Sequence, residues 1–150
     1  MLLLLFEIGK GRYALDVNQI IEVVPLVIFK NIPATPDYVV GLMNYRGAGT
    51  PVIDLNQLIA SIPSVDLLST RIIIVRFPVK GMGYKPLGLI ASNITETARS
   101  QLAKPPATGV LMDRSLYSGG MLPDTKDMIQ WFDIAKMLPE SEIAQLYEER

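Results

Sequence analysis

The sequence contains no cysteine and no histidine. Without cysteine the chain can form no disulfide and offers no thiolate to a metal ion. Without histidine it lacks the side chain that most often serves as acid, base or metal ligand near neutral pH. Every Ser-His or Cys-His catalytic pair is thereby excluded. We therefore expect no bound metal, no cofactor and no enzymatic activity.

Long hydrophobic runs and an excess of either charge are also missing. Apolar residues make up 49% of the chain, but no run approaches the ~20 residues of a membrane-spanning helix. The opening run, residues 1–6, has no basic leader and stops at Glu7, so it predicts a strand and not a signal peptide. The formal charge is only -1, and no basic patch suggests nucleic-acid binding. We expect a cytoplasmic protein with no nucleic-acid partner and no direct membrane insertion.

Short apolar runs, separated by glycine, proline, asparagine or aspartate, dominate the 150 residues. Runs of this kind, rich in Ile, Val, Leu and Tyr, are typical of β-strands. Many short strands at regular spacing favour small closed barrels or a sandwich, so the predicted fold class is all-β. The predicted strands cover residues 2–8, 12–17, 20–29, 39–45, 50–55, 71–77, 86–91, 116–122 and 127–132.

A few short helices complete the predicted elements. Asp54 and Asp133 each follow a predicted strand and precede apolar residues at helical spacing. Both are predicted N-caps, because a carboxylate there accepts hydrogen bonds from the free N–H groups of the first helical turn. A C-terminal helix is predicted over 139–150, with Ile143 and Leu146 on one face. Residues 61–70 and 98–109 are predicted to be loops.

Three short segments recur along the chain in the same order. Residues 15–23 are echoed by 89–97, residues 45–47 by 117–119, and residues 53–59 by 132–138. Each similarity is weak by itself, but the shared order favours an internal duplication. We therefore predict a single domain over 1–150 with two internally similar β-barrel halves. Their boundary is expected near 70–85, with the terminal segments able to cross between the halves.

The stretch 36–55 is the most distinctive part of the sequence. Its apolar runs are interrupted by Gly41, Gly47 and Gly49, a pattern that predicts two strands joined by a tight bend. Gly47 and Gly49 are available for positive φ angles at that bend. Between residue 39 and the bend, the only strongly polar side chains belong to Asn44 and Arg46.

The same stretch resembles the signature of the CheW family, adaptors of bacterial chemotaxis arrays, which read roughly G-hydrophobic-x-N-L-R-G-x-x-x-P-V-hydrophobic-D-L. The matching positions are Gly41, Asn44, Arg46, Gly47, Pro51, Val52, Asp54 and Leu55. The likeness covers nearly the whole chain, through further segments at 6–9, 13–17, 32–38 and 131–134. Three departures are clear: Tyr45 stands where leucine is usual, Gly49 and Thr50 replace an apolar pair, and Ser92 stands where aspartate is usual.

The resemblance implies two small SH3-like five-stranded barrels packed together, with a hydrophobic groove between them. It also implies a non-enzymatic adaptor that couples a CheA-type histidine kinase, through its regulatory domain, to the cytoplasmic tips of methyl-accepting chemoreceptors. The alternative is a small all-β ligand-binding domain or a carboxylate-based hydrolase. The carboxylates available to such a hydrolase are Asp16, Glu22, Asp54, Glu96 and Asp133. Two of them, Asp54 and Asp133, are better explained as helix caps.

The predicted partner-binding residues lie on two strands that we expect to be close in space: Ile20, Glu22, Gly41, Asn44, Arg46 and Gly47. Arg46 has two open interpretations, a structural tie to loop carbonyls or Asp54, and a contact to the partner. Glu22 is either a solvated strand residue or a contact near the bend. We expect Ile20 to be exposed, so that Ile20→Asp would weaken binding and leave stability nearly unchanged.

Overall fold

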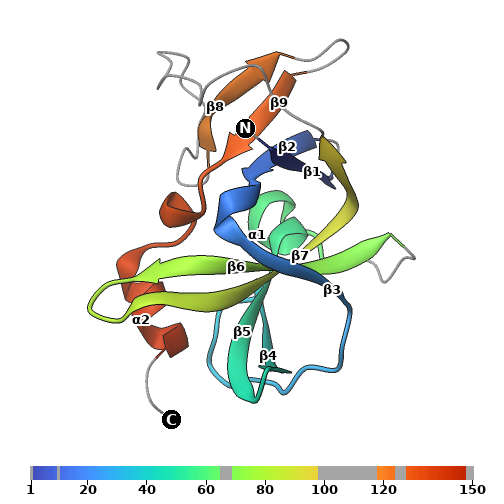
Figure 1. Ribbon diagram of the computed structural model, residues 1–150. Coiled ribbons are helices and arrows are strands. Elements are labelled where there is room, and N and C mark those ends of the chain that lie inside the picture. The colour runs from blue at the N-terminus through green and yellow to red at the C-terminus, as the bar shows by residue number, and fades with distance from the viewer. Residues whose placement is uncertain (1, 10, 65–68, 98–117, 124–127, 148–150) are drawn as a thin grey trace.

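The computed structural model describes residues 2–9, 11–64, 69–97, 118–123 and 128–147. Strands dominate the described residues (Figure 1), which confirms the all-β prediction. Two α-helices, α1 (Leu55–Ala60) and α2 (Glu140–Tyr147), and two 3-10 turns, η1 (Val17–Gln19) and η3 (Ile134–Lys136), accompany them. The strands are β1 (Leu3–Ile8), β2 (Gly11–Asp16), β3 (Ile20–Pro25), β4 (Val39–Tyr45), β5 (Ala48–Asp54), β6 (Thr70–Val79), β7 (Gly83–Thr97), β8 (Ser118–Pro123) and β9 (Met128–Phe132).

One five-stranded set consists of β3, β4, β5, β6 and the first part of β7. β6 and β7 form a long hairpin, β3 pairs with the far edge of β6, and β5 runs parallel to β7. β4 and β5 form a second hairpin. Lys30 closes the set, because it exchanges two backbone hydrogen bonds of 2.8 Å with Leu42 on β4. The chain thus returns from the end of β3 to the edge of β4.

The other five-stranded set consists of β1, β2, β9, β8 and the last part of β7. β1 pairs antiparallel with both β2 and β7, and β9 pairs parallel with β2 and antiparallel with β8. β7, with its 15 residues, therefore belongs to both sets. In Figure 1 it runs from the β6 hairpin in one set to β1 in the other.

The core explains why the run 71–75 contains so few polar residues. On β6, Ile73 and Val75 join the main cluster, whereas Ile72 and Ile74 point into a second cluster with Met43. Successive strand residues face opposite sides, so a strand covered on both faces reads as a continuous apolar run. A third, smaller cluster around Trp131 lies in the other set, and the main cluster draws residues from both sets.

The C-terminal helix is confirmed, and α2 packs against the first set of strands. Ile143 and Leu146 are buried in the main core, as their spacing predicts. The hydroxyl of Tyr38 donates to the Glu142 carboxylate, and that of Tyr147 donates to the carbonyl of Pro86 at 2.9 Å. Within the described ranges, no helix has the length and apolar character needed to cross a membrane.

Several predicted boundaries differ from the structure. β3 ends at Pro25 and does not reach residue 29, and Pro25 itself has no N–H with which to continue the ladder. β7 extends from Gly83 to Thr97, well beyond the predicted 86–91. Residues 98–109, 116–117 and 127 lie outside the described residues, so the loop and strand ends predicted there stay predictions. The internal duplication and its boundary also stay predictions.

Candidate functional site

A two-residue turn connects β4 to β5 and forms the centre of the candidate site. Tyr45 pairs with Ala48, so Arg46 and Gly47 are the turn residues, with φ angles of 52° and 84°. Two positive φ angles in a two-residue hairpin loop define a type I′ turn. The Asn44 side chain supports it, because its Oδ1 accepts a hydrogen bond of 2.9 Å from the Gly47 N–H.

The prediction for the bend is half right. Gly47 has the expected positive φ, but Gly49 does not; it lies within β5, paired with Asn44. The second positive φ belongs to Arg46, a residue type that seldom adopts this conformation. Nothing in the residue type of Arg46 indicated this.

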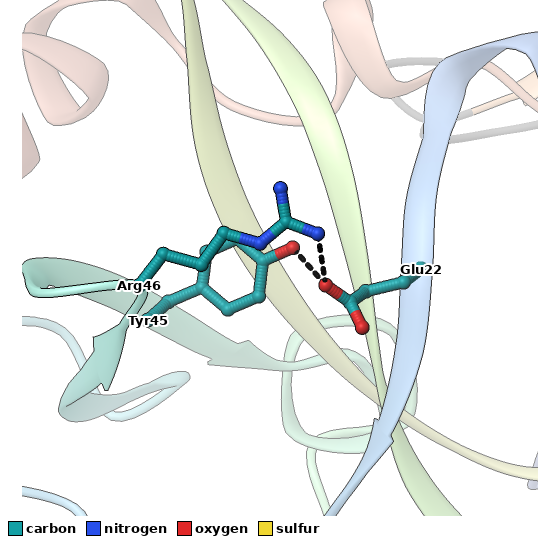
Figure 2. A network of polar contacts seen from close by, with 3 residues as sticks. All are labelled: Glu22, Tyr45 and Arg46. Carbon is teal, nitrogen blue, oxygen red and sulfur yellow. Dashed lines mark hydrogen bonds and ion pairs between the residues drawn. The ribbon is translucent and has the colours of Figure 1, made fainter.

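Glu22, Tyr45 and Arg46, here called the turn cluster, meet across the gap between β3 and the β4–β5 turn (Figure 2). Arg46 Nη2 donates to Glu22 Oε2 at 2.9 Å, and the Tyr45 hydroxyl donates to the same oxygen. The Arg46 Cζ atom also lies 5.2 Å from the centroid of the Tyr45 ring, within cation–π range. One carboxylate oxygen thus holds two neighbouring side chains of the turn.

The three side chains differ in exposure. Tyr45 is only 9% exposed, whereas the Arg46 side chain is 70% exposed and that of Glu22 37%. Burial, together with the hydrogen bond to Glu22, raises the pKa of the Tyr45 hydroxyl above its usual value near 10, and Arg46 opposes that rise. Tyr45 is therefore a neutral donor at physiological pH, and the cluster presents one exposed guanidinium to solvent.

The predicted proximity of Glu22 to the bend is confirmed by these contacts. The interpretation of Arg46 as a tie to Asp54 is wrong. Asp54 is buried and its carboxylate caps α1, accepting from the backbone N–H groups of Asn56 and Gln57 and from Ser64. Arg46 instead forms its ion pair with Glu22.

Two of the predicted contact residues are less exposed than expected. Ile20 is half-buried and packs against the main core, so it is not the exposed residue that was expected. From this packing we expect Ile20→Asp to lower stability as well as binding. Gly41 is buried with φ at 144°, and a Cβ there would lie 2.4 Å from the Lys30 carbonyl oxygen. Gly41 shapes the backbone, while Glu22, Asn44, Arg46 and Gly47 lie at the surface or half-exposed.

Sequence reasoning missed the apolar side chains that are exposed on β3, before and after Glu22, and on the segment that follows. On β3 these are Ile21 and Val23, and on the segment that follows they are Val27 and Ile28, the last 96% exposed. The pairing of β3 with β6 is irregular between Ile20 and Glu22. Because such an irregularity shifts which side chains face the core, alternation alone could not say whether Ile20 or Ile21 is exposed.

A cleft of about 680 Å³ lies elsewhere, between the tip of the β6–β7 hairpin and α2. Its walls include Pro78, Tyr84, Leu138 and Ile143, and it contains none of the predicted site residues. Among the residues that the structure describes, no three Asp or Glu side chains gather as metal ligands would.

Comparison with known proteins gives consistent matches. The CheW-like domain family model matches residues 2–142. The chain is 26% identical to the chemotaxis protein CheW of Klebsiella aerogenes over 145 residues, which cover 94% of this chain and 83% of that protein. It is 24% identical to the CheW protein of Treponema pallidum over 149 residues, 96% of this chain and 85% of that protein.

Shorter and structural matches agree. A CheW protein of Helicobacter pylori is 34% identical over 71 residues, so this match spans 47% of the chain and 43% of that protein. The crystal structure of the scaffolding protein TtCheW from Thermoanaerobacter tengcongensis is similar with a TM-score of 0.78 and 25% identity. That superposition covers 91% of this chain and 90% of the TtCheW chain.

Proposed function

The chain belongs to the CheW-like domain family, and from this membership we propose that it is a non-enzymatic adaptor of chemotaxis-type signal transduction. It couples the regulatory domain of a CheA-type histidine kinase to the cytoplasmic tips of chemoreceptors through protein–protein contacts. The proposal is supported by the relatives described as chemotaxis proteins and by the similarity to a scaffolding protein. A cytoplasmic location is part of it.

The observation that carries the proposal is the surface around the turn cluster. Two exposed apolar residues, Ile21 and Val23, flank Glu22 of the turn cluster along β3. The exposed Asn44 and Arg46 lie at the end of the hairpin that Glu22 contacts. Protein interfaces commonly combine an apolar centre with a polar rim, and single exposed charges at the rim tune association rate and partner choice. We propose that Ile21 and Val23, and not the half-buried Ile20, supply the apolar contact to the partner.

The absence of catalytic activity is proposed on the sequence, which offers neither histidine nor cysteine. Two carboxylates of the alternative hydrolase, Asp54 and Asp133, accept hydrogen bonds from helical N–H groups and are committed to capping. The alternative is therefore not favoured.

The proposal is tested with a pull-down and a calorimetric titration against the regulatory domain of a CheA-type kinase and a chemoreceptor cytoplasmic fragment. The double variant Ile21→Thr/Val23→Thr keeps both residues β-branched, so the strand propensity of β3 is preserved. We expect binding to weaken about tenfold or more, which corresponds to about 1.4 kcal/mol, with a nearly unchanged melting temperature.

The matched control is Ile62→Thr, because Ile62 is exposed on the segment after α1 and outside this surface. It should bind as the unchanged protein does. Equal losses in the control and the double variant, or no loss in either, would place the contact elsewhere.

A further inference from the structure

We propose that Tyr45 is a positioning residue of this surface: its hydroxyl and its ring together hold Glu22 and Arg46 in one arrangement, so that the guanidinium is already ordered when the partner arrives. This inference rests on the proposed function, because it assigns a role within the same contact surface. It assigns no contact between Tyr45 and the partner, since the Tyr45 side chain is buried.

The first reason is the backbone of Arg46. A type I′ turn favours Asn or Asp followed by glycine, because these residues tolerate positive φ at low cost. Here arginine occupies the first turn position with φ at 52°, although asparagine would fit the turn better. A strained conformation of this kind persists where surrounding contacts determine it, and it points to a use for the side chain.

The second reason is the number of contacts that fix the guanidinium. Glu22 Oε2 accepts from Arg46 Nη2, and the Tyr45 hydroxyl donates to that same oxygen, so Tyr45 restrains the acceptor. The guanidinium of Arg46 also lies over the Tyr45 ring, with 5.2 Å between its Cζ atom and the ring centroid. Figure 2 shows the other terminal nitrogen of Arg46 directed away from Glu22. The structure thus leaves one edge of a restrained, 70% exposed arginine open to solvent.

Restraint matters because a long side chain that becomes fixed on binding loses conformational freedom at the expense of affinity. An arginine that is ordered beforehand avoids most of this loss. Removal of the Tyr45 hydroxyl should release Glu22 and mobilise Arg46, without removing any atom that the partner touches. We expect partner binding to weaken about three- to tenfold, the range that follows from ordering one such side chain.

The central experiment compares Tyr45→Phe with the unchanged protein in two measurements. NMR relaxation of the Arg46 Nε–H group in the free protein should report greater mobility in the variant. Titration with the purified regulatory domain of a CheA-type kinase should report weaker binding. Tyr84→Phe is the matched control, because Tyr84 is 71% exposed on the β6–β7 hairpin, away from the turn cluster; it should change neither measurement.

A double-variant comparison separates positioning from a merely structural role. If Tyr45 acts through Arg46, then Tyr45→Phe should weaken binding in the native background and have no further effect in an Arg46→Ala background. Arg46→Asn adds a second check, because it improves the turn while removing the guanidinium. It should melt no earlier than the unchanged protein and still bind less tightly.

The outcomes distinguish the two proposals. Unchanged Arg46 mobility in Tyr45→Phe, or equal losses of affinity in both backgrounds, overturns the positioning role. If Arg46→Ala weakens binding while Tyr45→Phe does not, the adaptor surface stands and only the role of Tyr45 fails. If the kinase domain does not bind the unchanged protein, the proposed function fails, and the mobility measurement alone still decides whether Tyr45 orders Arg46.

Discussion

Gly41 lies where the backbone at Lys30 passes closest to β4. Its φ of 144° and the 2.4 Å between a built Cβ and the Lys30 carbonyl oxygen leave no room for a side chain. We predict that Gly41→Ala lowers the free energy of unfolding by about 2–4 kcal/mol, from backbone strain and overpacking together. Urea unfolding measures this. Gly49→Ala is the control, since Gly49 has no positive φ and its nearest neighbour, a Leu42 methyl group, lies at 3.8 Å; a comparable loss there would contradict the explanation.

The two aspartate caps should differ in strength. Asp54 is 5% exposed and accepts from two N–H groups of α1 and from both the N–H and the hydroxyl of Ser64. Asp133 is half-buried and accepts from the Ala135 N–H. Asp54→Ala should therefore cost about 2–4 kcal/mol, because buried donors lose their acceptor, and Asp133→Ala about 1 kcal/mol. Chemical denaturation of both variants checks the order, and the reverse order would be inconsistent with these contacts.

Residue-level features could be predicted from the sequence where one local interaction decides them. Asp54, Asp133 and Gly47 are such cases, because a cap or a tight turn strongly prefers those residue types. The positive φ of Arg46 could not be predicted, since it follows from the pairing of Tyr45 with Ala48, which leaves a two-residue turn, and not from the residue type. The partial burial of Ile20 likewise depends on an irregular pairing with β6, which the sequence of β3 does not indicate.

At the scale of elements, α2 is attached to the first set of strands through tyrosine hydroxyls. Burial raises the pKa of Tyr147, and burial together with the bond to Glu142 raises the pKa of Tyr38. Both groups keep their protons in the folded state at pH values where the unfolded chain, with tyrosine pKa values near 10, loses them. Their contribution to stability is therefore complete below about pH 10 and is lost as the pH rises above it.

We predict accordingly that the free energy of unfolding falls above about pH 10, by up to about 1.4 kcal/mol per pH unit for Tyr147 and by less for Tyr38, which is less deeply buried and better screened by solvent. Tyr147→Phe should reduce this slope and also cost about 1 kcal/mol at neutral pH, because the hydrogen bond to Pro86 is lost. Urea unfolding between pH 8 and 11 gives both quantities. Tyr84→Phe, on an exposed residue, should leave the slope unchanged; a flat profile in the native protein would exclude the explanation.

At the scale of the whole molecule, the least predictable features are the pairings between distant strands. β2 pairs parallel with β9, and β5 pairs parallel with β7. Hairpins such as β6–β7 follow from glycines at the turn, but parallel pairs have no connecting turn and so no local signal. The three recurring segments of the sequence predict paired barrels, but they do not indicate which strands join the two. β7 is longer than predicted because it serves both sets.

This sharing of β7 and of the main core predicts that the two sets unfold together. Trp131 is the single tryptophan and lies buried in the third cluster, within the second set. Ile74 lies in the second cluster, within the first set. Ile74→Val should cost about 0.5–1.5 kcal/mol. If the sets are coupled, the urea midpoint reported by Trp131 fluorescence must shift as far as the midpoint reported by far-UV circular dichroism. The opposite outcome is a Trp131 transition that stays in place while the dichroism splits into two steps. The two sets of strands would then unfold independently, because the shared core couples them too weakly.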